Sequence, residues 1–427
     1  MLTPPSRLVL AYVGTAHLAL LAAAVLALVS ADEVAASYVH PRTLGIVHLV
    51  TLGWLTATAL GAVHALMPMI LRTHFTARWP DVVACIAVLV GASGVIAHML
   101  LATYSGVAWS GGTIALGAAW VGGRCVLALG KAAAPRLQKI AAGLAFTGLV
   151  AAAVLGSLVA IDRSQPVFPG GHLHTLAAHA HLALVGWLGV LTVGIGHRLL
   201  PMLLPASPLE GARPAWTVGF LALGAVALPT TWLLAPWPSK LPIFAAIPLV
   251  LGAVCFALDL VALRARRKPK AKGLPRRDPA LLLIGFSVIC MVVAAGLGLS
   301  LMLVDLEPGI TALYGVLLLV GGLGGIVLGV GLRLWPIYAW MRAFARTALV
   351  PEATPGELPN YPLQWTAVLA WISAVIGLGV GMARHDPVAV LAGAFGWTLA
   401  SAATCANLWL VLSRARRAQP AGHTPLP

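Results

Sequence analysis

Charged residues are scarce in this chain. Of its 427 residues only 9% are Asp, Glu, Lys or Arg, whereas 60% are hydrophobic and the mean hydropathy is +0.95. A water-soluble domain has about 25% charged residues, so a soluble protein of this size could not cover its surface with so few. The composition therefore excludes a soluble enzyme and predicts an all-α polytopic membrane protein whose main partner is the lipid bilayer.

Cysteine and acidic residues are also few. The five cysteines form no CxxC or CxxCH motif, which excludes a disulfide framework and a covalent haem attachment site. The 27 Lys and Arg outnumber the 12 Asp and Glu, but the basic residues are dispersed among the loops between apolar segments. Anionic lipid headgroups account for such a distribution, and we expect no nucleic-acid partner.

Long apolar segments are abundant. A spanning helix needs about 20 apolar residues, and the sequence predicts twelve such helices. The first is longer than the apolar region of a signal peptide, so we interpret it as a retained span. The predicted spans are 8–30, 43–71, 82–102, 107–130, 139–161, 175–203, 215–235, 241–263, 280–304, 310–340, 362–382 and 387–413.

The basic residues also predict the orientation. With the N-terminus inside, most Lys and Arg fall on inner segments, including the basic linker 264–279 and the basic residues after the last span. The positive-inside rule then places both termini in the cytoplasm, in the plasma (inner) membrane. Arg124, Arg198 and Arg333 are expected to reach towards inner headgroups. Residues 416–427 are expected to form a tail, frayed from Gln419 onward.

An internal repeat organises the chain, which we expect to form a single membrane domain. The segment HLVTLGWLTATALGAVHALMP from His48 is matched without gaps by HLALVGWLGVLTVGIGHRLLP from His181, at an offset of 133 residues. A weaker copy, from Val316, follows 135 residues later and lacks the histidines. This periodicity predicts three pseudo-symmetric four-helix repeats, at approximately 1–135, 136–270 and 271–415.

Thirteen histidines in so apolar a chain point to function, because ionisable side chains inside a membrane are costly. His48 and its repeat equivalent His181 lie at the same predicted depth, in the outer third of the membrane. His179 lies two residues before His181, so the two side chains point roughly 200° apart on a helix and can ligate different cofactors. His48, with His179 or His181, is therefore a candidate axial pair for a haem iron.

Other histidines are weaker candidates for metal ligands. His98, near the outer end of the third span, and His172 and His174, in the predicted outer loop, are candidates for a copper or zinc site. His64 and His197 lie near inner helix ends, where they can instead cap backbone carbonyls. A buried histidine can also simply bond a neighbouring helix, as we expect for His17 in the first span.

The motif HAHLALVGW, with glycine seven and proline fourteen residues after Trp187, resembles the haem-ligand helix of the catalytic subunit I of haem-copper oxidases, especially C-type cytochrome c oxidases and nitric oxide reductases. That family also has twelve helices in three four-helix arcs. The resemblance implies that His48 matches the second-helix ligand of a non-covalent, b-type haem and that His179 and His181 match the HisXHis pair.

The chain also departs from that family. The family has its HisXHis pair on the tenth helix, whereas here it lies on the sixth, and the seventh span lacks the family's copper-binding histidines. The resemblance thus implies a diverged member with an incomplete oxidase centre, which handles electrons or a gas such as dioxygen or nitric oxide. Any enzymatic activity would be that of an oxidoreductase of this type, with a redox subunit or electron donor on the outer face.

Two alternatives from other classes remain. One is a membrane protein that handles or transports copper or another metal without haem, although the methionines and cysteines form no MxxM or CxxC ladder. The other is a scaffold without haem that binds a partner subunit.

The glycine run from Gly321 to Gly325 predicts close helix packing rather than a phosphate-binding loop, because no strand precedes it.

Overall fold

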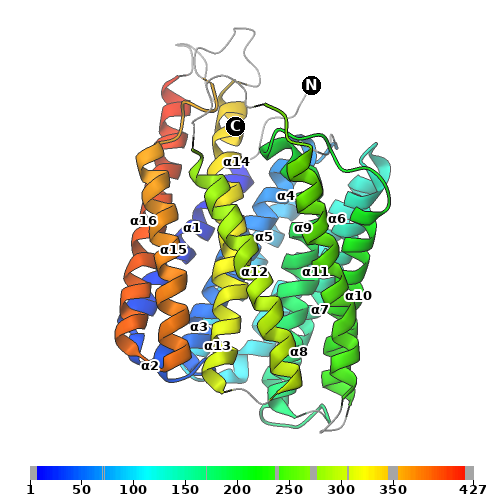
Figure 1. The fold of residues 1–427 in the computed structure, drawn as a ribbon, viewed down its shortest axis with the longest axis vertical. Coiled ribbons are helices and arrows are strands. Elements are labelled where there is room, and N and C mark those ends of the chain that lie inside the picture. Colours follow the sequence, from blue (N-terminus) through cyan, green and yellow to red (C-terminus); the bar gives the residue numbers. More distant parts are fainter. Residues whose placement is uncertain are drawn as a thin grey trace. The chain divides into compact units, whose positions relative to one another are not determined.

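A computed structural model describes residues 7–69, 71, 73–169, 171–235, 240–269, 277–304, 307–344 and 354–418. The described chain has twelve helical segments that are long and apolar enough to cross a membrane, so the predicted all-α polytopic fold is confirmed. Their order is shown in Figure 1. The first apolar segment forms a full-length helix, and the last helix continues to Arg417, beyond the predicted end at 413. The predicted frayed tail from Gln419 lies outside the described residues.

The elements, with η marking 3-10 and π-helical segments, are α1 (Arg7–Val29), α2 (Ala31–Ala36), α3 (Pro41–His48), η1 (Leu49–Thr56), α4 (Ala57–Met69), α5 (Trp79–Leu100), η2 (Tyr104–Gly106), α6 (Val107–Lys131), α7 (Arg136–Asp162), α8 (His172–His181), η3 (Leu182–Gly189), α9 (Val190–Leu203), α10 (Arg213–Leu234), α11 (Leu241–Ala265), α12 (Pro279–Leu303), α13 (Pro308–Val316), η4 (Leu317–Gly324), α14 (Gly325–Phe344), α15 (Tyr361–Arg384) and α16 (Pro387–Arg417).

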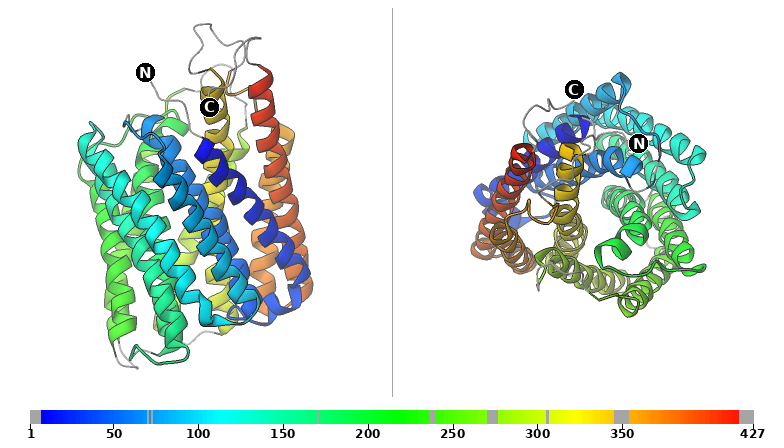
Figure 2. Two further views of the ribbon diagram at one scale, coloured as in Figure 1. Left: turned by 180° about the vertical axis from the view of Figure 1, so that it is seen from behind. Right: turned by 90° about the horizontal axis from the view of Figure 1, so that it is seen from above.

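The chain divides into two compact units. The first unit comprises residues 1–77, 273–294 and 307–427, and the second comprises residues 78–272 and 295–306. In the first unit α16 packs along α15 and α1, and in the second α6 packs along both α5 and α7. Figure 2 shows these antiparallel neighbours from behind and from above. The predicted repeat boundaries remain a prediction.

Three π-helical segments mark the middle of long spans. They are η1, η3 and η4, each eight residues long, and each begins directly after the first residue of a repeat copy, His48, His181 or Val316. The three copies therefore share a local backbone as well as a sequence pattern. A π-helical turn is rare and often marks a functional site.

Glycine is the fifth residue of each π-helical segment, and it allows close packing. A Cβ atom on Gly53 would lie 2.8 Å from the Cβ of Ala19 on α1, and one on Gly321 would lie 2.9 Å from the Sγ of Cys290 on α12. In the second copy, a Cβ on Gly148 of α7 would lie 2.5 Å from the carbonyl oxygen of Gly186 in η3. The segments η1, η4 and η3 thus pack closely against α1, α12 and α7, the first helices of the predicted repeats, and in the second copy the approach is to backbone atoms.

Candidate functional site

His48 is the last residue of α3, where the helix passes into η1. Its Nδ1 lies 2.7 Å from the carbonyl oxygen of Leu44, one turn earlier. Because a carbonyl only accepts hydrogen bonds, Nδ1 must carry the proton, and in the neutral ring Nε2 then carries the lone pair. A histidine that ligates a metal through Nε2 commonly has this bond to a backbone carbonyl on its other nitrogen.

His181 has the same local geometry in the second repeat. It is the last residue of α8, before η3, and its Nδ1 lies 3.0 Å from the carbonyl oxygen of Ala177. Its ring meets the ring of Trp232 on α10 edge to face, with the centroids 4.7 Å apart. The repeat equivalents His48 and His181 therefore share one tautomer and one place relative to a π-helical segment.

His179 contacts a different helix. Its Nδ1 lies 3.1 Å from the carbonyl oxygen of Ala152 on α7. Gly156, one turn further along α7, makes room for the ring, because a Cβ there would lie 2.8 Å from Cε1 of His179. His179 thus contacts α7 while His181 contacts α10, and both hold their proton on Nδ1. His48 belongs to the first unit and the other two histidines to the second, so the pairing of His48 with either one stays a prediction.

The weaker metal candidates are engaged in local contacts. His98 at the end of α5 has Nδ1 2.7 Å from the carbonyl oxygen of Thr103. His172 and His174 lie in the first turn of α8, so their predicted position in a loop was wrong. The Nδ1 of His172 lies 3.6 Å from Oδ2 of Asp162. The other carboxylate oxygen, Oδ1, accepts hydrogen bonds from the backbone N–H groups of Val167 and Phe168 in the connecting loop.

His64 on α4 is enclosed by aromatic rings. It is 3% exposed, and its ring centroid lies 6.1 Å from that of Tyr12 and 5.1 Å from that of Phe75.

Among the described residues, no three His, Cys, Asp or Glu side chains come together as ligands of one ion. A metal ion at any of these places would therefore take at most two such ligands from that part of the chain.

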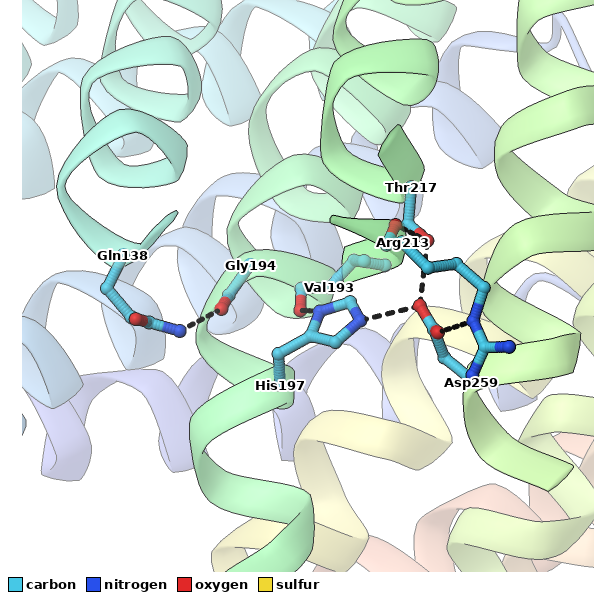
Figure 3. Close-up of polar contacts among 7 residues, drawn as sticks. All are labelled: Gln138, Val193, Gly194, His197, Arg213, Thr217 and Asp259. Carbon is cyan, nitrogen blue, oxygen red and sulfur yellow. Dashed lines mark hydrogen bonds and ion pairs between the residues drawn. The ribbon is translucent and has the colours of Figure 1, made fainter. Parts of the chain in front are cut away.

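His197 lies in a polar cluster that joins α9, α10 and α11 (Figure 3). Its Nδ1 is 2.7 Å from the carbonyl oxygen of Val193, and its Nε2 is 2.9 Å from Oδ2 of Asp259. The same carboxylate accepts hydrogen bonds from Nε of Arg213 at 2.5 Å and from the hydroxyl of Thr217 at 2.8 Å. Asp259 is 2% exposed, so three polar side chains surround a buried carboxylate.

Both ring nitrogens of His197 face hydrogen-bond acceptors. A neutral imidazole has one N–H and cannot donate to both the carbonyl and the carboxylate. A neutral His197 can therefore donate to only one of these two acceptors at a time. A metal ion bound to His197 would have to displace one of these two hydrogen bonds.

Sequence reasoning missed this cluster, because its members are far apart in the chain. A counterpart lies in the first repeat, where Asp81 on α5 accepts hydrogen bonds from Arg124 and Trp120 on α6. Both clusters join the third and fourth helices of a repeat, but the acidic residue is on the third helix in one and on the fourth in the other. The sequence signal that could have pointed to these clusters is the scarcity of carboxylates within the spans.

Two arginines that the sequence assigned to headgroups instead pair with carboxylates. Arg124 forms an ion pair with Asp81, and Arg333 on α14 forms one with Asp278, just before α12. Both arginine side chains are largely buried, at 16% and 18% exposure. They therefore join helices within a unit, because pairing inside the protein offsets the cost of burying their charge.

No family model matches the chain, and no curated protein matches it significantly.

Proposed function

We propose that this chain is a haem-binding integral membrane protein built on a scaffold like that of subunit I of haem-copper oxidases. The observation that carries the proposal is the shared geometry of His48 and His181. Both stand at the entrance to a π-helical segment at equivalent repeat positions, and both direct Nδ1–H to a carbonyl one turn earlier.

The donor set fits an axial role. Imidazole nitrogen is a common axial ligand of haem iron, and the fixed Nδ1–H bond holds each ring in one orientation with the lone pair on Nε2. His179 offers the same tautomer towards α7. A bound haem would supply one-electron or gas-binding chemistry, while these residues hold their rings in place and their Nδ1 protons on backbone carbonyls.

The proposed role is electron transfer or the handling of dioxygen or nitric oxide, with an incomplete oxidase centre. We propose the plasma membrane as its location, with both termini in the cytoplasm, in keeping with the distribution of Lys and Arg. The histidine sites then lie nearer the outer face, where a redox subunit or other electron donor would dock. The proposed haem is non-covalent and of b type, because the chain has no CxxCH motif.

Ligand variants test this proposal. We expect His48→Ala and His181→Ala each to abolish, or to convert to a high-spin form, a low-spin bis-imidazole haem spectrum in the purified protein. His17→Ala is the matched control, since His17 also directs Nδ1 to the carbonyl one turn earlier, at 2.7 Å from Val13, but lies outside the repeat motif. Absorption and electron paramagnetic resonance spectra make the comparison.

An unchanged spectrum in both ligand variants would contradict the assignment of these histidines. Folded protein that contains copper but no haem would instead favour the metal-handling alternative. If all three variants unfold and lose the signal, the milder exchanges His48→Gln and His181→Gln distinguish the loss of a ligand from unfolding.

A further inference from the structure

A small cavity in the first unit, apart from the proposed haem ligands, has a mostly apolar lining with four polar side chains. Its volume, measured as the space that the centre of a water-sized sphere can occupy, is about 20 Å³. The polar residues that line it are His17 on α1, Thr58 on α4, and Thr404 and Asn407 on α16, and Trp54 and Trp335 are among its apolar walls. A site needs about 10–15 Å³ by this measure to hold one water, so the cavity has room for one.

The polar lining is almost completely buried. His17 and Thr58 are each 6% exposed, and Thr404 and Asn407 are each 4% exposed. The hydroxyl oxygen of Thr58 is buried and has no hydrogen-bond partner among the described residues. A buried hydroxyl without a partner is destabilising, which indicates that something else satisfies it.

The other lining groups offer a complementary set of donors and acceptors. His17 donates from Nδ1 to the carbonyl of Val13, which leaves the lone pair on Nε2 as an acceptor. Asn407 accepts the backbone N–H of Asn360 at 2.9 Å with Oδ1, which leaves its amide nitrogen as a donor. Thr404 already donates to the carbonyl of Ala400 at 2.8 Å.

We propose that this cavity binds one structural water molecule. The water donates to Nε2 of His17, accepts from the amide nitrogen of Asn407 and exchanges a hydrogen bond with the hydroxyl of Thr58. It thereby joins α1, α4 and α16 inside an apolar region. His17 was expected to bond a neighbouring helix directly; instead its Nδ1 bonds its own helix, and the water provides the link to the neighbours.

The stability of Thr58→Val tests the proposal by the sign of its effect. Valine keeps the shape of threonine but removes the hydroxyl. If the hydroxyl bonds a water, the purified full-length variant should show a Tm lower by about 1–3 °C. If the cavity is dry, removing an unpartnered hydroxyl should leave Tm unchanged or raise it. Thr404→Val is the matched control, since Thr404 lines the same cavity but its hydroxyl donates to the carbonyl of Ala400 in its own helix, and its Tm should stay within about 1 °C.

Direct observation decides the case if Thr58→Val does not fold. An experimental map of the wild-type protein, at a resolution where other buried waters are visible, should show one density peak within hydrogen-bond distance of both Thr58 and His17. An empty cavity in such a map, or uptake of xenon into it under pressure, would overturn the proposal, because xenon enters dry apolar cavities.

Discussion

Gly148→Ala is expected to destabilise the second unit strongly, although it adds a single methyl group. The new Cβ would lie 2.5 Å from the carbonyl oxygen and 2.7 Å from the carbonyl carbon of Gly186. These are backbone atoms of η3 and cannot rotate away as a side chain can. Overpacking of this kind costs about 1–3 kcal/mol, and Gly148→Val should prevent accumulation of folded protein. Thermal unfolding and the yield of monodisperse protein in detergent measure the effect.

Gly143→Ala on the same helix is the matched control. A Cβ at Gly143 has only the Cγ2 of Val126 at 4.0 Å, so alanine fits there without displacement. Because alanine favours a helix by roughly 0.5–1 kcal/mol over glycine, this variant should be as stable as the wild type or more stable. Equal stability of the two alanine variants would show that α7 and η3 do not approach each other as described.

Asp259→Ala is expected to produce the second large effect. The carboxylate is 2% exposed and bonds His197, Arg213 and Thr217. Its removal leaves a buried imidazole and the Arg213 guanidinium without their acceptor, and breaking a buried pair costs about 3–5 kcal/mol. The Arg213 side chain is 42% exposed and can turn to solvent, so the lower end of this range is expected. Denaturant or thermal unfolding of the purified protein measures it.

Asp259→Asn should lose less stability than Asp259→Ala. Its amide oxygen can still accept from Arg213, while its NH₂ group can donate to Nε2 of a neutral His197, so both contacts keep a donor and an acceptor. Glu33→Gln is the surface control, because the Glu33–Arg42 pair is 31% and 48% exposed, and exposed pairs contribute about 0–1 kcal/mol. An alanine variant no less stable than Glu33→Gln would contradict the structural role of this cluster.

The spans and the fold class could be predicted because they depend on local composition. Runs of about 20 apolar residues have few alternatives to a transmembrane helix, and the repeat was visible because glycine and histidine recur at fixed offsets. Span ends were less predictable. His172 and His174 are polar enough to suggest a loop, yet α8 begins at His172 because Gly171, at φ +81°, allows the chain to turn there.

The π-helical segments and the charge clusters could not be predicted. A π-helical turn depends on hydrogen bonds five residues apart, and the apolar segment LALVGWLG gives no sign of that pattern. Contacts between helices also contribute to these segments. The indole N–H of Trp371 on α15, for example, donates to the carbonyl of Val320 in η4, 51 residues away. Likewise, Arg213 and Asp259 are 46 residues apart, so only the packing of α10 against α11 brings them together.

The most direct test of the haem proposal is the absorption spectrum of the detergent-purified wild-type protein, oxidised and dithionite-reduced, with iron and copper quantified in the same sample. The protein should be produced in a host supplied with haem. The proposal predicts a Soret band, sharp α and β bands on reduction, and at least one iron per chain. A featureless spectrum from folded, monodisperse protein without iron would contradict it.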